Sequence, residues 1–212
     1  MTKAKKKLTI FVSSTVYDNK ALLDQLYDTL TVFGYEVWMS HKGTVPVRSH
    51  HTALANCLNA VDECDLFLGI ITPSYGSGKV GNGLSITHKE IKRAIELDKP
   101  RWLLAHADVV FARRLLLDLD YDTSEKRKAL QLKKGAKSIT DLRVIDMYED
   151  ATRHEVSQLD ERYGNWVQEF SLDKDVLLFA TAQFSHIDEV ESFIKENMAK
   201  PKSAKSHKGG AK

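Results

Sequence analysis

Short apolar runs alternate along the chain with stretches in which apolar residues recur every three or four positions. The runs cover residues 8–12, 35–39, 66–71 and 101–105, and their length and composition are typical of strands. The run at 66–71 is continuously apolar, which indicates a strand buried on both faces. Regular alternation of strands and helices predicts a parallel, doubly wound α/β sheet.

The stretches between the runs have the periodicity of amphipathic helices. Gly34 and Pro100 follow two of them, as expected of helix ends. The apolar positions at helical spacing are Leu22, Leu26, Leu30 and Phe33 in the first stretch, Ala53, Leu54, Cys57, Leu58 and Val61 in the second, and Ile91, Ala94 and Ile95 in the third.

After residue 105 the pattern is weaker, and we interpret residues 142–147 as a fifth strand. The rest is interpreted as a helix at 109–119, mostly polar helix at 149–170, a further strand or buried segment at 176–184, and a helix at 187–198. Four parts are expected: a basic segment at 1–7, an α/β domain at 8–150, a C-terminal extension packed on it at 151–198, and a disordered Lys-rich tail at 199–212.

The formal net charge of +2 hides an uneven distribution. Nine of the 31 basic side chains lie at the two ends, which leaves 22 basic against 29 acidic side chains in the body. An acidic body gives no reason to expect specific nucleic-acid binding. No apolar run is long enough for a secretion signal or a membrane span, so we expect a cytoplasmic protein without membrane contact. Cys57 and Cys64 are expected to be reduced, and no metal-site pattern is present.

A glycine-rich loop follows the third predicted strand. Its residues 76–81 read G-x-G-x-x-G, but the motif follows the wrong strand for a dinucleotide site, and no acidic residue stands at the required distance after it. Two interpretations remain open. The loop either lies on the surface without a ligand or closes over a phosphate-bearing ligand.

Glu90 lies at the start of the next helix and also has two interpretations. Thr87 and Glu90 fit a capping box, in which the glutamate bonds to an amide at the start of its own helix. Alternatively, Glu90 is catalytic, because ligands of open α/β sheets bind where strand carboxyl ends meet helix N-termini. A carboxylate there can stabilise the cationic state that forms when a sugar–base bond breaks.

Hydroxyl and aromatic side chains stand at the ends of the first two predicted strands. Ser13, Ser14 and Thr15 either cap the next helix or hold phosphate and ribose oxygens. Trp38 is either a core aromatic residue or a ring that stacks on a ligand base. Together with Ser85 and the candidate carboxylate, these side chains are expected to surround one cleft.

Over residues 8–115 the chain resembles the Toll/interleukin-1 receptor (TIR)-like domains, and most closely an uncharacterised branch that opens with I-F-V-S-S-T-x-x-D. The resemblance is carried by Ile10-Phe-Val-Ser-Ser-Thr-Val-Tyr-Asp18, Glu63-Cys-Asp-Leu-Phe67, Tyr75-Gly76, Ser85-Ile-Thr-His-Lys-Glu90 and Lys99-Pro100. It implies a flavodoxin-like sheet of five strands. In active relatives a glutamate at the position of Glu90 cleaves nicotinamide from NAD.

The resemblance also implies a set of binding residues and a biological setting. Several active relatives have an aromatic residue where this chain has Ile86, so Trp38 or Tyr75 would have to stack on nicotinamide, and His88 of the shared motif joins the binding residues. The function implied is a glycohydrolase or cyclase with NAD as substrate and no required cofactor, in signalling or antiviral defence. Self-association on activation and a separate signalling ATPase partner are expected. The alternatives are a non-catalytic interaction module and an enzyme that processes nucleosides or nucleotide sugars.

Overall fold

The structure is a computed structural model that describes residues 6–16, 19–76, 78 and 83–199, with side chains as far as Glu196. The tail from residue 200, which is expected to be disordered, lies outside the described residues. The same holds for residues 77 and 79–82 of the glycine-rich loop and for Asp18 of the N-terminal motif. The strands are β1 (Thr9–Ser14), β2 (Glu36–Trp38), β3 (Leu66–Ile71), β4 (Arg101–His106) and β5 (Val167–Phe170). The helices are α1 (Lys20–Val32), α2 (Ala53–Glu63), α3 (Ile86–Glu96), α4 (Ala107–Asp118), α5 (Ser124–Arg127), α6 (Arg143–Ala151), α7 (Asp173–Phe184) and α8 (Ile187–Ala199).

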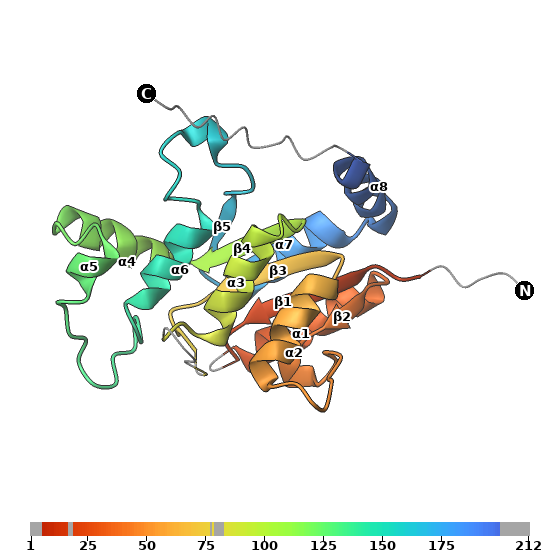
Figure 1. The fold of residues 1–212 in the computed structure, drawn as a ribbon, viewed down its shortest axis with the longest axis horizontal. Helices are drawn as coiled ribbons and strands as arrows, with labels where there is room; N and C mark the ends of the chain where they lie inside the picture. The colour runs from red at the N-terminus through yellow and green to blue at the C-terminus, as the bar shows by residue number, and fades with distance from the viewer. Residues whose placement is uncertain (1–5, 17–18, 77, 79–82, 200–212) are drawn as a thin grey trace, which may run out of the picture.

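The five strands form one sheet in the order β2-β1-β3-β4-β5, and every neighbouring pair is parallel (Figure 1). Phe11 of β1 stands opposite Trp38 of β2 on one side and opposite Phe67 of β3 on the other. This strand order is flavodoxin-like and confirms the predicted α/β class. The order reverses between β1 and β3, which makes the ends of these two strands the topological switch point.

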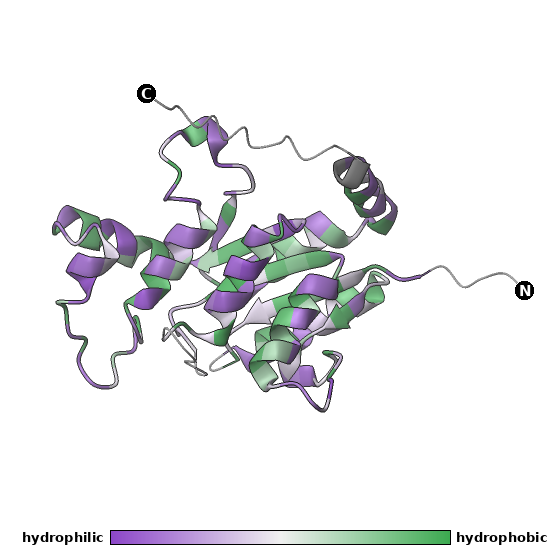
Figure 2. Ribbon diagram, in the orientation of Figure 1, coloured by the Kyte–Doolittle hydropathy of each residue, from purple (hydrophilic) through white to green (hydrophobic). Residues whose placement is uncertain are grey.

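Helices cover both faces of the sheet and bury two apolar clusters. On one face α2, α3 and α6 contribute Val61, Ile91 and Met147 to a cluster that α4 also joins. On the other face Leu26 of α1 and Phe184 of α7 pack in a second cluster together with residues of α8. The strands at the centre are largely hydrophobic, whereas the helices are mixed (Figure 2). This is the pattern expected for a sheet buried on both faces.

The predicted fifth strand at 142–147 is wrong, because this segment forms α6. Val144, Met147 and Ala151 are buried, and their spacing of three and four residues puts them on one side of a helix. An apolar run as short as 142–147 fits either a strand or a buried helix when it is read alone. α6 packs between α3 and α4, as Figure 1 shows.

The fifth strand lies later in the chain, within the stretch interpreted as polar helix at 149–170. β5 pairs with β4 through Leu103 opposite Val167 and forms the far edge of the sheet. The segment at 176–184 belongs to α7, so a further strand there is also wrong, while the helix predicted at 187–198 is confirmed as α8. The chain after residue 150 therefore supplies a strand and a helix of the sheet domain itself.

Three further observations bear on chemistry. In residues 6–16, 19–76, 78 and 83–199, no helix is both long and apolar enough to cross a membrane, and no group of His, Cys, Asp or Glu is placed to hold a metal ion. Cys57 and Cys64 are free thiols. Cys64 is buried and its Sγ donates to the carbonyl of Val61 at 3.2 Å, so it belongs to the end of α2.

Candidate active site

The switch point brings the first two candidate side chains together. Ser13, near the carboxyl end of β1, is buried, and its Oγ donates a hydrogen bond of 2.5 Å to Oε2 of Glu90. Glu90 comes from α3, which packs beside β1. The two residues lie 77 positions apart in the chain, so only the fold brings the hydroxyl and the carboxyl group into contact.

The start of α3 excludes the capping interpretation of Glu90. The N-cap of the helix is Ser85, whose side chain accepts a hydrogen bond from the backbone N–H of His88. Thr87 lies inside the first turn, so Thr87 and Glu90 do not form a capping box. The carboxyl group of Glu90 is held by Ser13 instead.

Burial shifts the pKa of Glu90, which is 4% exposed. Removing the carboxyl group from water raises its pKa above the ordinary value, although hydrogen bonds from Ser13 and Cys57 act in the opposite direction. Burial, together with the nearby Glu90, raises the pKa of the Cys57 thiol to about 12. Cys57 therefore stays protonated and acts as a hydrogen-bond donor to Glu90, not as a nucleophile.

A second contact joins the segments that follow β1 and β3. The hydroxyl oxygens of Thr15 and Thr72 lie 2.7 Å apart in a buried position. Gly76 has a φ of +83°, and a Cβ there would lie 2.7 Å from Cγ2 of Thr15, so a glycine is needed for this close approach. Ser14 is half-buried and its hydroxyl bonds to the carbonyl of Thr15 at 3.3 Å.

The surroundings of the hydroxyls at 13–15 and of the Trp38 ring bear on their two interpretations. The N-cap of α1 is Asn19, so the hydroxyls at 13–15 do not cap that helix. Trp38 is 9% exposed, packs in the same cluster as Phe11, and its Nε1 donates to Oε1 of Glu36 at 3.0 Å. This burial favours the core interpretation of Trp38 and leaves its ring little surface on which a base could stack.

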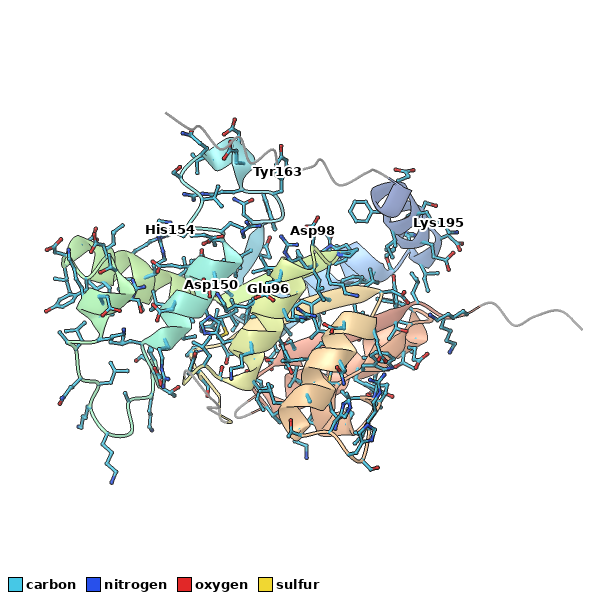
Figure 3. All side chains as sticks on the ribbon, in the orientation of Figure 1. Glu96, Asp98, Asp150, His154, Tyr163 and Lys195 are labelled. Carbon is cyan, nitrogen blue, oxygen red and sulfur yellow. The ribbon has the colours of Figure 1, made fainter. Side chains whose placement is uncertain are left out.

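Tyr75, Ser85 and His88 form a separate hydrogen-bonded chain at the other side of α3. The hydroxyl oxygen of Tyr75 accepts from the backbone N–H of Ser85 at 3.3 Å and lies 2.8 Å from Nδ1 of His88. Nε2 of His88 lies 2.8 Å from Oδ2 of Asp150, on α6 beside α3 (Figure 3). If the Tyr75 proton is donated to Nδ1, the Nε2–H of His88 is the donor to Asp150.

The negative charge of Asp150, at the end of these hydrogen bonds, is stabilised by its neighbours. Nζ of Lys92 lies 3.1 Å from the same oxygen of Asp150. Burial alone would raise the pKa of the Asp150 carboxyl group, but the hydrogen bond from His88 and the charge of Lys92 outweigh burial and lower it. An ionised Asp150 therefore closes the chain that begins at Tyr75.

Arg143 fixes the position of Tyr75 from the side of α6. Its guanidinium lies over the Tyr75 ring at 4.9 Å from the centroid, and it also bonds to Asp141 and to the carbonyl of Gly83. The backbone N–H of Tyr75 donates to Oγ1 of Thr140 at 3.0 Å. These contacts connect the segments on both sides of the glycine-rich loop to residues 140–143.

A cavity of about 490 Å³ lies next to this connection, between α5, α6 and the segment that precedes α3. Glu90 does not line it. Its walls are a mixture of leucines and charged groups that include Leu84, Leu130, Leu142, Arg127, Arg143 and Asp146. Glu90 and Ser13 therefore form a buried pair that is distinct from this cavity.

Sequence reasoning did not identify Cys57, Asp150 and Lys92 as neighbours of the candidate residues. Cys57 has a sequence signal only as an apolar helix position, because its contact with Glu90 depends on how α2 packs against α3. For Asp150 a usable signal was present, since the helical spacing of residues 144–151 places this carboxylate on α6.

Replacing Tyr75 with Phe tests the buried chain. The variant leaves Nδ1 of His88 and the N–H of Ser85 without their partner, so we expect the free energy of unfolding to fall by about 1–3 kcal/mol. Chemical denaturation measures this change. Tyr148→Phe is the control, since among the described residues the Tyr148 hydroxyl has no hydrogen bond. Equal losses in both variants would contradict the role assigned to the chain.

The raised pKa of Glu90 predicts a pH dependence of stability. Because the folded-state pKa lies above the unfolded value, the contribution of Glu90 is complete below the unfolded pKa and is lost as the pH rises through the folded pKa. The free energy of unfolding of the wild type, minus that of Glu90→Gln, should therefore decrease above about pH 4.5, by at most about 1.4 kcal/mol per pH unit. Asp150 has a lowered pKa, so the stability that it contributes is lost only at more acidic pH, as the pH falls through its folded-state pKa. Denaturation at pH 4–9 measures the difference, and a constant difference would contradict the prediction.

Comparison with known proteins gives a family but no activity. No curated protein matches the chain. A family model described as "Domain of unknown function (DUF4062)" matches residues 9–158, a range that contains β1 to β4, α1 to α6 and the contacts of Glu90 and His88 described above. Because the model matches more than half of the 212 residues, the chain belongs to the DUF4062 family.

Proposed function

We propose that the chain is a TIR-like NAD-cleaving enzyme, a glycohydrolase or cyclase with Glu90 as its catalytic carboxylate. The observation that carries this proposal is the position of Glu90. It lies at the β1/β3 switch point, where flavodoxin-like sheets bind ligands, and it is held there by Ser13. A carboxyl group with a raised pKa at such a position is a candidate functional group.

In the proposed reaction the bond between ribose and nicotinamide breaks, and nicotinamide leaves with the electron pair of that bond. The ribose carbon becomes cationic, and ionised Glu90 stabilises this charge. In a glycohydrolase, water adds to the carbon and releases a proton, whereas in a cyclase a nitrogen of the adenine ring adds. Hydrogen bonds from Ser13 and Cys57 hold the carboxyl group in one orientation.

The proposal includes a setting and further binding residues. Ser14 and Thr15, beside the carboxyl end of β1, would hold phosphate or ribose oxygens, and Tyr75 and His88 would contribute through their buried chain. The resemblance to TIR-like domains supports a role in signalling or antiviral defence, with self-association on activation and a separate ATPase partner.

A second candidate function is a non-catalytic interaction module. It is favoured by the burial of Glu90, which is 4% exposed, and by the position of the described cavity away from this residue. In such a module the Ser13–Glu90 pair would serve to pack α3 on β1, and binding to other chains would be the activity.

Release of nicotinamide from NAD separates the two candidates. The purified chain is incubated with about 1 mM NAD, near the upper end of usual KM values, at dilute and high protein concentration, and nicotinamide is measured by chromatography. The enzyme proposal predicts release that saturates with NAD and increases with pH as Glu90 ionises. A folded chain that releases no nicotinamide at any concentration would favour the interaction module.

A further inference from the structure

α4 carries an exposed apolar stripe on the side that faces away from the sheet. Phe111, Leu115 and Leu119 are 65%, 44% and 57% exposed. Their spacing of four residues puts them on one side of the helix, while Val109 and Leu116 on the other side are buried. α4 lies at one end of the molecule, beyond α6 as seen from α3 (Figure 1), so the stripe is accessible to another molecule.

Two opposite charges flank the stripe on the same side. Arg114 and Asp118 are exposed, and rotation by about 100° per residue places both next to the line from Phe111 to Leu119. They are four positions apart, yet in the part of the chain that the structure describes they form no ion pair with each other or with another residue. Arg113, by contrast, is turned inward and pairs with Glu149 at 3.2 Å.

This arrangement is complementary to itself under two-fold symmetry. When two copies of α4 pack antiparallel with Leu115 at the symmetry axis, Phe111 of each copy meets Leu119 of the other. A two-fold axis brings the same flank of both helices together. Arg114 of each copy then lies two positions, or about 3 Å along the helix axis, from the level of Asp118 in the other copy, and the two side chains converge because each leans toward the N-terminus of its own helix. The apolar stripe and the flanking charges therefore match in a single arrangement.

We propose that the outer face of α4 is the surface through which two copies of this chain associate, as an antiparallel, two-fold symmetric helix pair. This surface rests on the proposed function, because self-association is expected to accompany that function. The test measures molecular mass and not NAD cleavage, so failure of the dimer can be distinguished from failure of the enzyme proposal. The stripe spans nine residues, from Phe111 to Leu119, or about 12 Å of helix. Such a short contact is smaller than a standard interface, so we expect a weak dimer with a Kd above about 1 µM.

Charge reversal gives a test that leaves the fold intact, since both residues are exposed. Sedimentation equilibrium of the full chain up to about 500 µM should show wild-type dimers in this weak range. Arg114→Asp alone and Asp118→Arg alone place like charges opposite each other, and each should weaken the dimer by about tenfold or more. Mixed one to one, the two variants regain opposite charges at both contacts, and the mixture should dimerise about as well as the wild type.

Matched substitutions on α4 locate the surface. Leu115 and Leu117 are 44% and 49% exposed but point to different sides of the helix. Leu115→Glu should abolish the dimer, whereas Leu117→Glu should leave the Kd unchanged within about twofold. A wild type that stays monomeric at every concentration overturns the proposal. A dimer that survives Leu115→Glu, or variants that do not associate when mixed, would likewise overturn it.

Discussion

Replacing Glu90 with Gln is expected to lower the rate of nicotinamide release by about 10²-fold or more. The change keeps the size of the side chain and one oxygen that can accept from Ser13, but it removes the charge that, in the proposed mechanism, stabilises the cationic ribose carbon. Loss of one preorganised electrostatic group typically costs a rate factor of this size. The measurement is the initial rate of nicotinamide release at saturating NAD.

A second glutamate on α3 provides the control for this variant. The Glu96 side chain is 60% exposed, and its Oε2 lies 3.5 Å from Nη1 of Arg93. Glu96 is the last residue of α3 (Figure 3). Glu96→Gln makes the same chemical change and should leave the rate within about twofold, because exposed pairs contribute little. Equal rates in wild type and Glu90→Gln would remove Glu90 from the mechanism.

Replacing Arg127 with Met is expected to be the most destabilising of the substitutions considered. Arg127 is 4% exposed and donates to Asp146 at 2.6 Å and to Glu149 at 2.5 Å. Met fills a similar volume but leaves two carboxylates without their shared cation. Loss of one partner of a buried pair costs about 3–5 kcal/mol, and partial exposure of both carboxylates places the expected loss at the lower end, about 3 kcal/mol.

Thermal unfolding measures this loss, which corresponds to a fall in Tm of roughly 6–12 °C for a domain of this size. Lys126→Met is the control, because the neighbouring Lys126 pairs with Asp120 and Asp122 at the surface. Exposed pairs contribute little, so this variant should leave the Tm close to that of the wild type. A change of similar size in both variants would show that the buried position of Arg127 has no special importance.

The N-terminal half of the fold was predictable because local pattern and tertiary environment agree there. A continuously apolar run such as β3 can be buried only at the centre of a sheet, and the stripe in α1 fits one helix face. The second half was not predictable in the same way. α6 is short and its apolar residues fit two periods, while β5 has four residues of which only Phe170 is buried. That β5 is a strand depends on its pairing with β4, and no local sequence pattern encodes this pairing.

The candidate site was predictable as a location but not as a set of contacts. Strand ends and helix starts can be read from the chain, and this places Ser13 and Glu90 near one edge of the sheet. Whether Trp38 faces a ligand or the core depends on the packing around it. The N-cap lies at Ser85, two residues before Thr87, and this position rules out the capping box of Thr87 and Glu90. The partner of His88 comes from a helix 62 residues away.

The late position of β5 in the chain has a consequence for how the protein forms. Sixty residues, 107–166, separate β4 from β5, so the last strand joins the sheet only after this intervening chain has been ordered or looped out, at an entropic cost that grows slowly with loop length. Contacts between distant segments slow folding. During synthesis, β1 to β4 are complete while the outer edge of β4 still has no neighbour. An open edge with unpaired backbone groups is where chains stick to one another, so the growing polypeptide passes through a period of exposure that ends when β5 and α7 arrive.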